Sequence, residues 1–107
     1  MEYTWKITEI KVKNEETHQN AVVQTYWQKI GTDAEGNIGI FEGATPFTSV
    51  DVPENEFVPV DQLTESIVLN WIQSKIDDTY ENHIHEMILK SIEDSKNPEQ
   101  TIDLPWN

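Results

Sequence analysis

The first apolar pattern in the chain has the two-residue period of a β-strand. Between residues 3 and 13 the apolar side chains alternate as far as Ile7 and then resume out of phase at Ile10. One extra residue moves the apolar set of a strand to its other face. The slip therefore predicts a first strand with a β-bulge near Thr8 or Glu9.

Two further strands are expected before residue 50. Residues 14–20 are polar and read as a connection, whereas residues 21–30 are rich in β-branched and aromatic side chains on both faces. A strand that is apolar on both faces belongs in the centre of a sheet. Residues 31–37 are rich in Gly and Asp, which is typical of a hairpin. Residues 38–50 predict a third strand, which glycines and Pro46 should make irregular or place at an edge.

The pattern changes to helical spacing after residue 63. Thr64 is a good N-cap, and the apolar residues between 67 and 76 recur on one face of a helix. A second helix start is predicted where Asp78 and Glu81 have the spacing of a capping box. Its apolar stripe continues until Pro98 ends the helix.

These elements predict one α+β domain, in which an antiparallel three-stranded meander is followed by two helices packed on one face. A short link makes the two helices neighbours. The predicted segments are a β meander in residues 1–50, an extended linker in 51–63, a helical hairpin in 64–97 and an extended C-terminal tail in 98–107.

The length and composition are those of one small domain. A chain of 107 residues buries roughly 65% of its unfolded surface, which supports a single core. Met1 is followed by Glu2 rather than by a basic and then apolar start, and no apolar run is long enough to span a bilayer. We therefore expect a soluble protein without a signal peptide. The chain has no cysteine, hence no disulfide and no thiolate.

The charge is strongly negative and unevenly distributed. The net charge is −13, and every basic residue is lysine. Residues 31–65 contain eight acidic residues and no basic one. Without arginine or a basic stripe, the chain is poorly equipped to bind nucleic acid or an anionic membrane. The acidity could imitate a phosphate backbone or attract a basic partner, but solubility is the simpler interpretation.

Metal sites and catalytic groups are not predicted from the sequence motifs. In "HIHE", Leu89 stands where a zinc-binding helix needs its second histidine after His85, and His83 points about 200° away around the helix. Both histidines read as ordinary solvated helix residues. In "TDAEGN" the first ligand of a calcium loop would fall on Gly31, so a hairpin turn is the better interpretation.

Catalysis by carboxylates or serines is not indicated either. Adjacent acidic residues such as Asp77 and Asp78 fall in polar turns, where both should be ionised. The serines lack a nucleophile-elbow context, and the glycines form no phosphate-binding loop. We therefore predict no enzyme activity, no catalytic residue, no metal ligand and no cofactor.

The four tryptophans separate into two groups. Trp5, Trp27 and Trp71 occupy inward-facing positions of two predicted strands and a helix, so they are expected in the core. Trp106 instead lies beyond the last helix, after a polar stretch. Its position in an otherwise expendable terminus requires a different explanation.

The C-terminal tail is the predicted partner-binding segment. Ile102 and Leu104 precede Trp106 at alternate positions, and Pro105 lies between the last two. Such a segment can add to a sheet edge or place its ring in a hydrophobic pocket. The sequence leaves open whether that pocket belongs to the same chain or to a neighbour.

Four stretches in fixed order resemble a family of small proteins encoded by tailed bacteriophages. They are "YTWKITEIKV", "VVQTYWQKIGTD", "FVPVDQLTESIVLNWIQSKI" and "MILKSIEDSKNPEQTIDLPW", and together they cover nearly the whole chain. The positions that carry the resemblance are Leu63, Thr64, Glu65 and Trp71 at the first helix, Lys96, Asn97 and Pro98 at the helix end, and Leu104, Pro105 and Trp106 at the close. The high acidity and "HIHE" depart from the family pattern.

The resemblance implies a phage origin and, with no catalytic residues, a structural role. We expect an accessory structural protein of the virion, at the capsid surface, neck or tail, which is assembled in the host cytoplasm. Its expected partner is a larger capsid or tail protein, and we expect it to bind neither nucleic acid nor a membrane. Whether it also forms a homo-oligomer is left open by the sequence. The alternative is an acidic, DNA-mimicking inhibitor of a host nucleic-acid-binding protein. An enzyme would require a cleft where His83 or His85 meets carboxylates.

Overall fold

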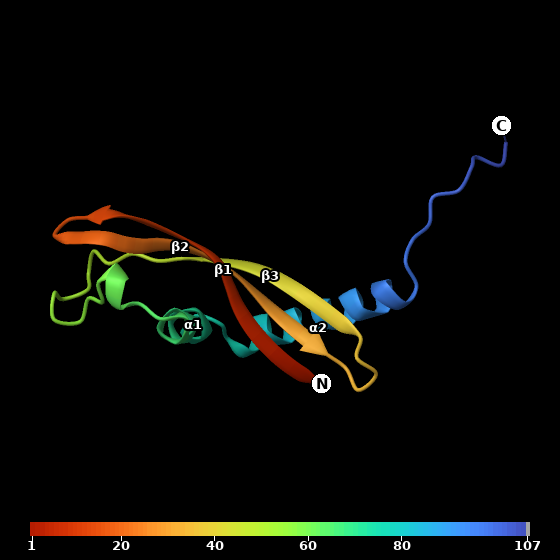
Figure 1. Ribbon diagram of the computed structural model, residues 1–107, viewed down its shortest axis with the longest axis horizontal. Helices are drawn as coiled ribbons and strands as arrows, with labels where there is room; N and C mark the ends of the chain where they lie inside the picture. Colours follow the sequence, from red (N-terminus) through yellow and green to blue (C-terminus); the bar gives the residue numbers. More distant parts are fainter. Residues whose placement is uncertain (107) are drawn as a thin grey trace.

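The computed structural model describes residues 1–106 as an antiparallel three-stranded sheet followed by two helices on one of its faces (Figure 1). The predicted α+β class and the meander are confirmed, because the strand order is β1-β2-β3. The elements are β1 (Glu2–Glu15), β2 (His18–Thr32), β3 (Ile38–Pro46), the 3-10 helix η1 (Val60–Gln62), α1 (Glu65–Ser74) and α2 (Asp78–Lys96).

The hairpin of β1 and β2 is longer than the sequence predicts. The expected bulge is present, because the pairing register shifts between Ile7 and Glu9. The predicted polar connection over residues 14–20 is wrong, since β1 continues to Glu15 and β2 begins at His18. Polar residues here extend the two strands because backbone pairing holds them together where most of their side chains face water.

β2 is the central strand, as its apolar pattern predicts. Its alternate residues Thr25, Trp27 and Lys29 are all buried on the face that carries the helices. Trp27 is opposite Ile7 of β1 and Gly43 of β3 in the sheet register. The indole is 1% exposed and donates a 3.0 Å hydrogen bond from Nε1 to the hydroxyl of Thr45.

β3 is an edge strand, as predicted, and two of its glycines make room for neighbours. A Cβ atom at Gly43 would overlap the ring of Trp27, and one at Gly39 would overlap the backbone carbonyl of Ile88 in α2. These glycines weaken the strand by propensity but allow the helix and the indole to approach the sheet closely.

The helix caps confirm one prediction and correct another. Thr64 is the N-cap of α1, and its side chain accepts a 3.2 Å hydrogen bond from the N–H of Ile67. The N-cap of α2 is Asp77 rather than the predicted Asp78, because Asp77 accepts the 2.7 Å bond from Tyr80. Two adjacent aspartates offer the same capping chemistry, so spacing alone misplaced this helix start by one residue.

Each helix also hydrogen-bonds an edge of the sheet. The carboxylate of Glu65 in α1 accepts from the N–H of Ile7 in β1 at 3.1 Å. The hydroxyl of Ser91 in α2 accepts from the N–H of Ile40 in β3 at 3.3 Å. These contacts satisfy backbone donors that an edge strand otherwise leaves to solvent.

One hydrophobic core lies between the helices and the sheet. Its apolar members come from the centre of β2 and from one stripe on each helix, as the helical spacing predicts. The buried residues of this cluster are Trp27, Val68, Ile72, Ile84, Ile88 and Ile92. None of the helices within residues 1–106 combines the length and the apolar character that crossing a membrane requires.

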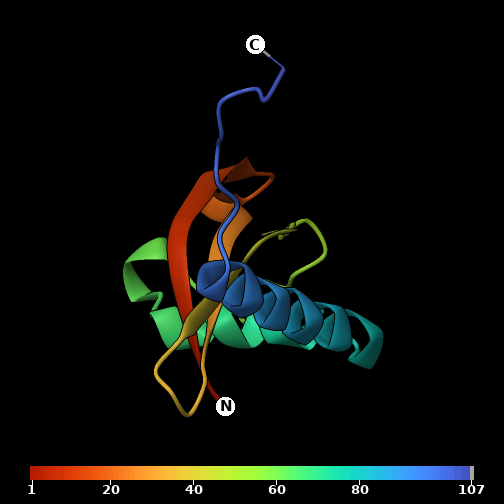
Figure 2. The ribbon, with the colours of Figure 1, turned by 90° about the vertical axis from the view of Figure 1, so that its right-hand side faces the viewer.

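The linker packs against the sheet and helices, whereas the tail does not. Residues 51–63 were predicted to be extended, but they contain turns and the helix η1. The turns fold the segment back on the domain, where Phe57 and Leu63 become partly buried. The chain after Asn97 has no regular structure and projects clear of the strands and helices (Figures 1 and 2). The last position of the predicted tail, Asn107, lies outside the described residues.

Candidate functional site

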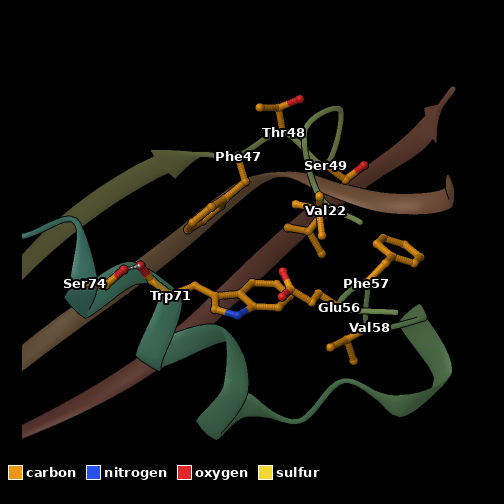
Figure 3. Close-up of a pocket in the computed structure, with 10 residues that line it drawn as sticks. Val22, Phe47, Thr48, Ser49, Glu56, Phe57, Val58, Trp71 and Ser74 are labelled. Carbon is orange, nitrogen blue, oxygen red and sulfur yellow. Dashed lines mark hydrogen bonds between the residues drawn. The ribbon is translucent and has the colours of Figure 1, made fainter. Parts of the chain in front are cut away.

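A pocket lined by aromatic side chains lies between α1, β2 and the segment that follows β3 (Figure 3). Phe47, Phe57 and Trp71 supply its rings, and Val22 supplies its floor near the sheet. Its volume is about 260 Å³. We call it the aromatic pocket below.

The wall formed by residues 47–58 is held by the far end of the β1–β2 hairpin. One carboxylate oxygen of Glu15 accepts from the N–H of Ser49 at 2.7 Å and from its hydroxyl at 3.0 Å. The other oxygen accepts from the hydroxyl of Thr48 at 3.1 Å. The backbone N–H of Ser49 is the main cause that lowers the pKa of Glu15, because these bonds favour the carboxylate form.

His18 fastens the same wall at a second point. It is only 5% exposed, and its Nε2–H donates a 2.8 Å hydrogen bond to the carbonyl oxygen of Val52. Its ring also stacks on Phe57, with 4.3 Å between the ring centroids. The length of the hairpin, which the sequence did not reveal, therefore positions one aromatic side of the pocket.

The opposite wall belongs to α1. Trp71 lies 6.0 Å from Phe47 between ring centroids, and Ser74 donates a 2.7 Å bond to the carbonyl of Trp71. The ammonium of Lys75 lies 4.4 Å from the centroid of Phe47 and donates to the carbonyl of Pro46 at 3.0 Å. These contacts tie the helix end to the end of β3.

The size and lining of the pocket suit one large apolar side chain. A cavity of about 260 Å³ falls below the roughly 300 to 1,000 Å³ of small-molecule sites and exceeds the about 150 Å³ that holds a benzene ring. Glu56 also lines the pocket and brings a carboxylate to it (Figure 3). An acceptor is therefore available for a ring that carries an N–H group.

The predicted partner-binding residues lie at the other end of the molecule. Ile102 is 72% exposed, Leu104 is 52% exposed and Trp106 is 77% exposed, and Pro105 is exposed with them. Within residues 1–106, Ile102, Leu104 and Trp106 each keep more than half of their surface exposed. The structure thus keeps the four residues together on one projecting segment but does not bring them to the aromatic pocket.

The remaining tryptophans follow their predicted placement. Trp27 is buried, whereas Trp5 and Trp71 are partly buried and pack against the core cluster. Trp5 lies 5.3 Å from Trp27 between ring centroids. Trp71 contributes to the core and to the aromatic pocket at once.

A second polar cluster surrounds Lys29, which is 5% exposed. Its ammonium lies 4.6 Å from the ring centroid of Tyr3 and 4.8 Å from that of Trp5. It also lies 2.8 Å from Nε2 of His85, which in turn lies 3.9 Å from a carboxylate oxygen of Glu81. Desolvation by burial lowers the pKa of Lys29, and the charge of Glu81 opposes this.

The Lys29 cluster corrects the interpretation of "HIHE". His85 points inward to Lys29 and stacks on Tyr3 at 4.5 Å between centroids, so it is not a solvated helix residue. His83 is exposed, as predicted, and its ring makes an edge-on contact with Phe41 at 5.9 Å between centroids. The two-residue period of β2 could have predicted the Lys29 contact, because it places Lys29 on the same inward face as Trp27.

The hairpin between β2 and β3 confirms the turn that "TDAEGN" predicts. Asp33 accepts hydrogen bonds from the N–H groups of Glu35 and Asn37 at 3.0 and 2.9 Å. The Asn37 N–H is the main cause that lowers the pKa of Asp33. Within residues 1–106, no group of three or more His, Cys, Asp or Glu side chains is arranged to hold a metal ion.

Comparison with known proteins gives a family but no characterised relative. No curated protein and no solved structure matches the chain. One family model matches residues 1–106, which is nearly the full length. The chain therefore belongs to the family described as domain of unknown function DUF7936.

Proposed function

We propose that the protein is an accessory structural protein of a tailed-phage virion and functions through protein–protein contacts at the capsid surface, neck or tail. The single observation that carries the proposal is the exposure of Ile102, Leu104 and Trp106 on a segment that projects from the domain. The phage assignment rests on the resemblance of the sequence motifs given above.

The tail has the chemical character of an interface element. A tryptophan that is 77% exposed gains free energy when a partner covers it, at roughly 25 cal/mol for each Å² of apolar surface. Tryptophan is also enriched among the residues that dominate binding energies. Neighbouring apolar groups at 102 and 104 enlarge the surface that one partner can bury.

The helix that precedes the tail is packed firmly on the sheet. α2 is fixed to the sheet by its three buried isoleucines, Ile84, Ile88 and Ile92. The tail leaves directly from the end of this helix. In the proposed arrangement, a larger capsid or tail protein binds the projecting segment, and the acidic residues face solvent or a basic surface of that protein.

Mass spectrometry of purified virions tests the proposal. The protein should copurify with particles at a fixed ratio to the major capsid or tail subunit. If it is abundant in infected cells but missing from particles, the proposal is wrong. Capture of a host nucleic-acid-binding protein by the purified chain would then favour the acidic inhibitor in its place.

A substitution in the tail tests the role of its indole. Trp106→Ala should weaken incorporation by about 2 to 4 kcal/mol of binding free energy, as expected for a ring buried at a contact. Ile38→Ala is the matched control, because Ile38 is also an exposed apolar residue, at 53%, but lies on the sheet. Equal incorporation of Trp106→Ala and wild type would show that the tail is not the contact.

A further inference from the structure

We propose that the tail of one copy of this chain binds in the aromatic pocket of a second copy, so that the molecules join head to tail. The inference rests on the proposed function, because it takes the tail to be a contact element and names its first partner. The tail supplies Leu104 and Trp106, and the pocket supplies Phe47, Phe57 and Trp71.

The two surfaces lie at opposite ends of the molecule. Figure 1 shows the tail leaving the far end of α2, whereas α1 and the segment after β3, which form the pocket, lie at the other end. The molecule measures 65 Å along its longest axis. A donor surface and an acceptor surface at opposite ends can be used by two different neighbours at the same time.

The tail can hardly reach the aromatic pocket of its own chain. To return, it must run back along α2, whose 19 residues make a rod of about 28 Å, and then continue past the end of α1. Residues 97–106 span at most roughly 35 Å when fully extended. The indole would arrive only on a stretched chain, whereas the tail of a neighbour reaches the pocket without this constraint.

The chemistry of the two surfaces matches. The pocket volume of about 260 Å³ accommodates an indole, since about 150 Å³ holds a benzene ring. The walls from Phe47 and Trp71 offer edge and face contacts to an incoming ring. Glu56 and the hydroxyl of Ser74 line the same pocket and can accept the indole N–H of Trp106.

The tail sequence lowers the cost of such docking. Pro105 fixes one backbone angle beside the indole, so less conformational freedom is lost when the segment binds. The exposed side chain of Leu104 can cover the rim while Trp106 enters. The partner copy therefore meets a short anchor that is already restricted in shape.

A head-to-tail contact has a consequence for assembly. The two surfaces differ, so the interface is heterologous and leaves one free tail and one free pocket at the ends of any open chain of molecules. Such contacts form a ring if the rotation between neighbours closes and a filament if it does not. Two copies that exchange tails reciprocally close into a two-fold dimer, whereas contacts made in one direction only give a larger ring or a filament.

Sedimentation velocity of the purified full-length protein, from micromolar to millimolar concentration, tests the inference. Wild type should form dimers or larger species. Trp106→Ala, which removes the anchor, should raise the dissociation constant about 30-fold or more. Ser74→Tyr, which fills the pocket from the exposed end of α1, should do the same. Val58→Glu is a second pocket variant in case Ser74→Tyr disturbs the helix end.

Mixing two deficient variants gives the decisive measurement. Trp106→Ala keeps its pocket and Ser74→Tyr keeps its tail, so the mixture should form a one-to-one heterodimer and nothing larger. Circular dichroism first establishes that both variants are folded. A mixture that stays monomeric, a wild type that stays monomeric, or full assembly by Trp106→Ala would each overturn the inference.

The outcome is separable from that of the proposed function. A monomeric protein that nevertheless copurifies with virions would leave the virion role standing and remove only the self-assembly. A protein that assembles head to tail but is missing from virions would do the reverse.

Discussion

The ammonium of Lys29 donates a 2.8 Å hydrogen bond to Nε2 of His85 and thereby joins the centre of β2 to α2. An ammonium group can only donate hydrogen bonds. Nε2 of the histidine must therefore be the acceptor, which places the ring proton on Nδ1. Tyr3 completes the contact, because its ring stacks on His85 and lies beneath the same ammonium. One buried cation thus links a strand, a helix and the first residues of β1.

Replacing this cation should destabilise the domain. Lys29→Ala removes the side chain from between Tyr3 and Trp5 and leaves Nε2 of His85 without its donor. We expect a loss of about 1 to 3 kcal/mol in the free energy of unfolding, measured by urea denaturation. Lys29→Met is the control, because it retains an unbranched side chain and should recover part of the loss.

The lowered pKa of Lys29 predicts that stability rises at alkaline pH. Burial disfavours the ammonium in the folded state, so the unfolded chain binds more protons between the lowered pKa and the ordinary value of 10.5. The free energy of unfolding should rise with pH through this window and then level off. The measurement is the difference between wild type and Lys29→Met, because other groups titrate in both. A constant difference across the window would contradict the assignment.

The lowered pKa of Glu15 predicts that stability also rises with pH in the acid range. The carboxylate contributes stability above its ordinary pKa of 4.5, and this contribution disappears as the pH falls through the lowered folded value. The protection of the Ser49 amide against hydrogen exchange, taken relative to the intrinsic rate at each pH, should therefore fall in acid as the wall of the aromatic pocket detaches. Glu15→Gln should show fast exchange already at neutral pH. Equal exchange in both proteins would show that the hairpin does not hold this wall.

A side chain at Gly43 should disrupt the core. A methyl group there overlaps the ring of Trp27, which is 1% exposed and cannot move aside freely. We expect Gly43→Ala to lower the free energy of unfolding by about 1 to 3 kcal/mol. Ala44→Val is the matched control on the next residue, whose side chain is exposed on the other face of the sheet. It should cost nothing, because a β-branched residue suits a strand.

Salt should strengthen the head-to-tail assembly. Each copy carries a net charge of −13, so neighbouring copies repel one another. Raising the ionic strength shortens the Debye length from about 10 Å at 0.1 M to about 3 Å at 1 M and screens this repulsion. Sedimentation equilibrium across that range should show a falling dissociation constant. Weaker association at high salt would indicate a contact carried by opposite charges instead.

Local signals in the sequence were sufficient for the elements and their order. The phase slip after Ile7 marks the bulge in β1, and Thr64 marks the start of α1, because both depend on residues adjacent in the chain. The central position of β2 followed from apolar groups on both its faces. The placement of Trp27 in the core followed from the same alternation.

The functional surfaces depended on contacts that no local pattern contains. The aromatic pocket is closed by Glu15 and His18, which reach residues 48 to 57 across the sheet end, and the sequence presented both as part of a polar connection. Phe57 and Val58, two adjacent apolar residues in an acidic stretch, were a signal for this wall.

The sequence by itself determined the α+β class, the three-stranded meander and the apolar tail, because alternation, helical spacing and caps act over a few residues. Only the tertiary structure decided that Lys29 is buried and that the tail and the aromatic pocket lie at opposite ends of the molecule. The physical reason is that burial and reach depend on which distant segments pack together, and those distances are set by the whole fold.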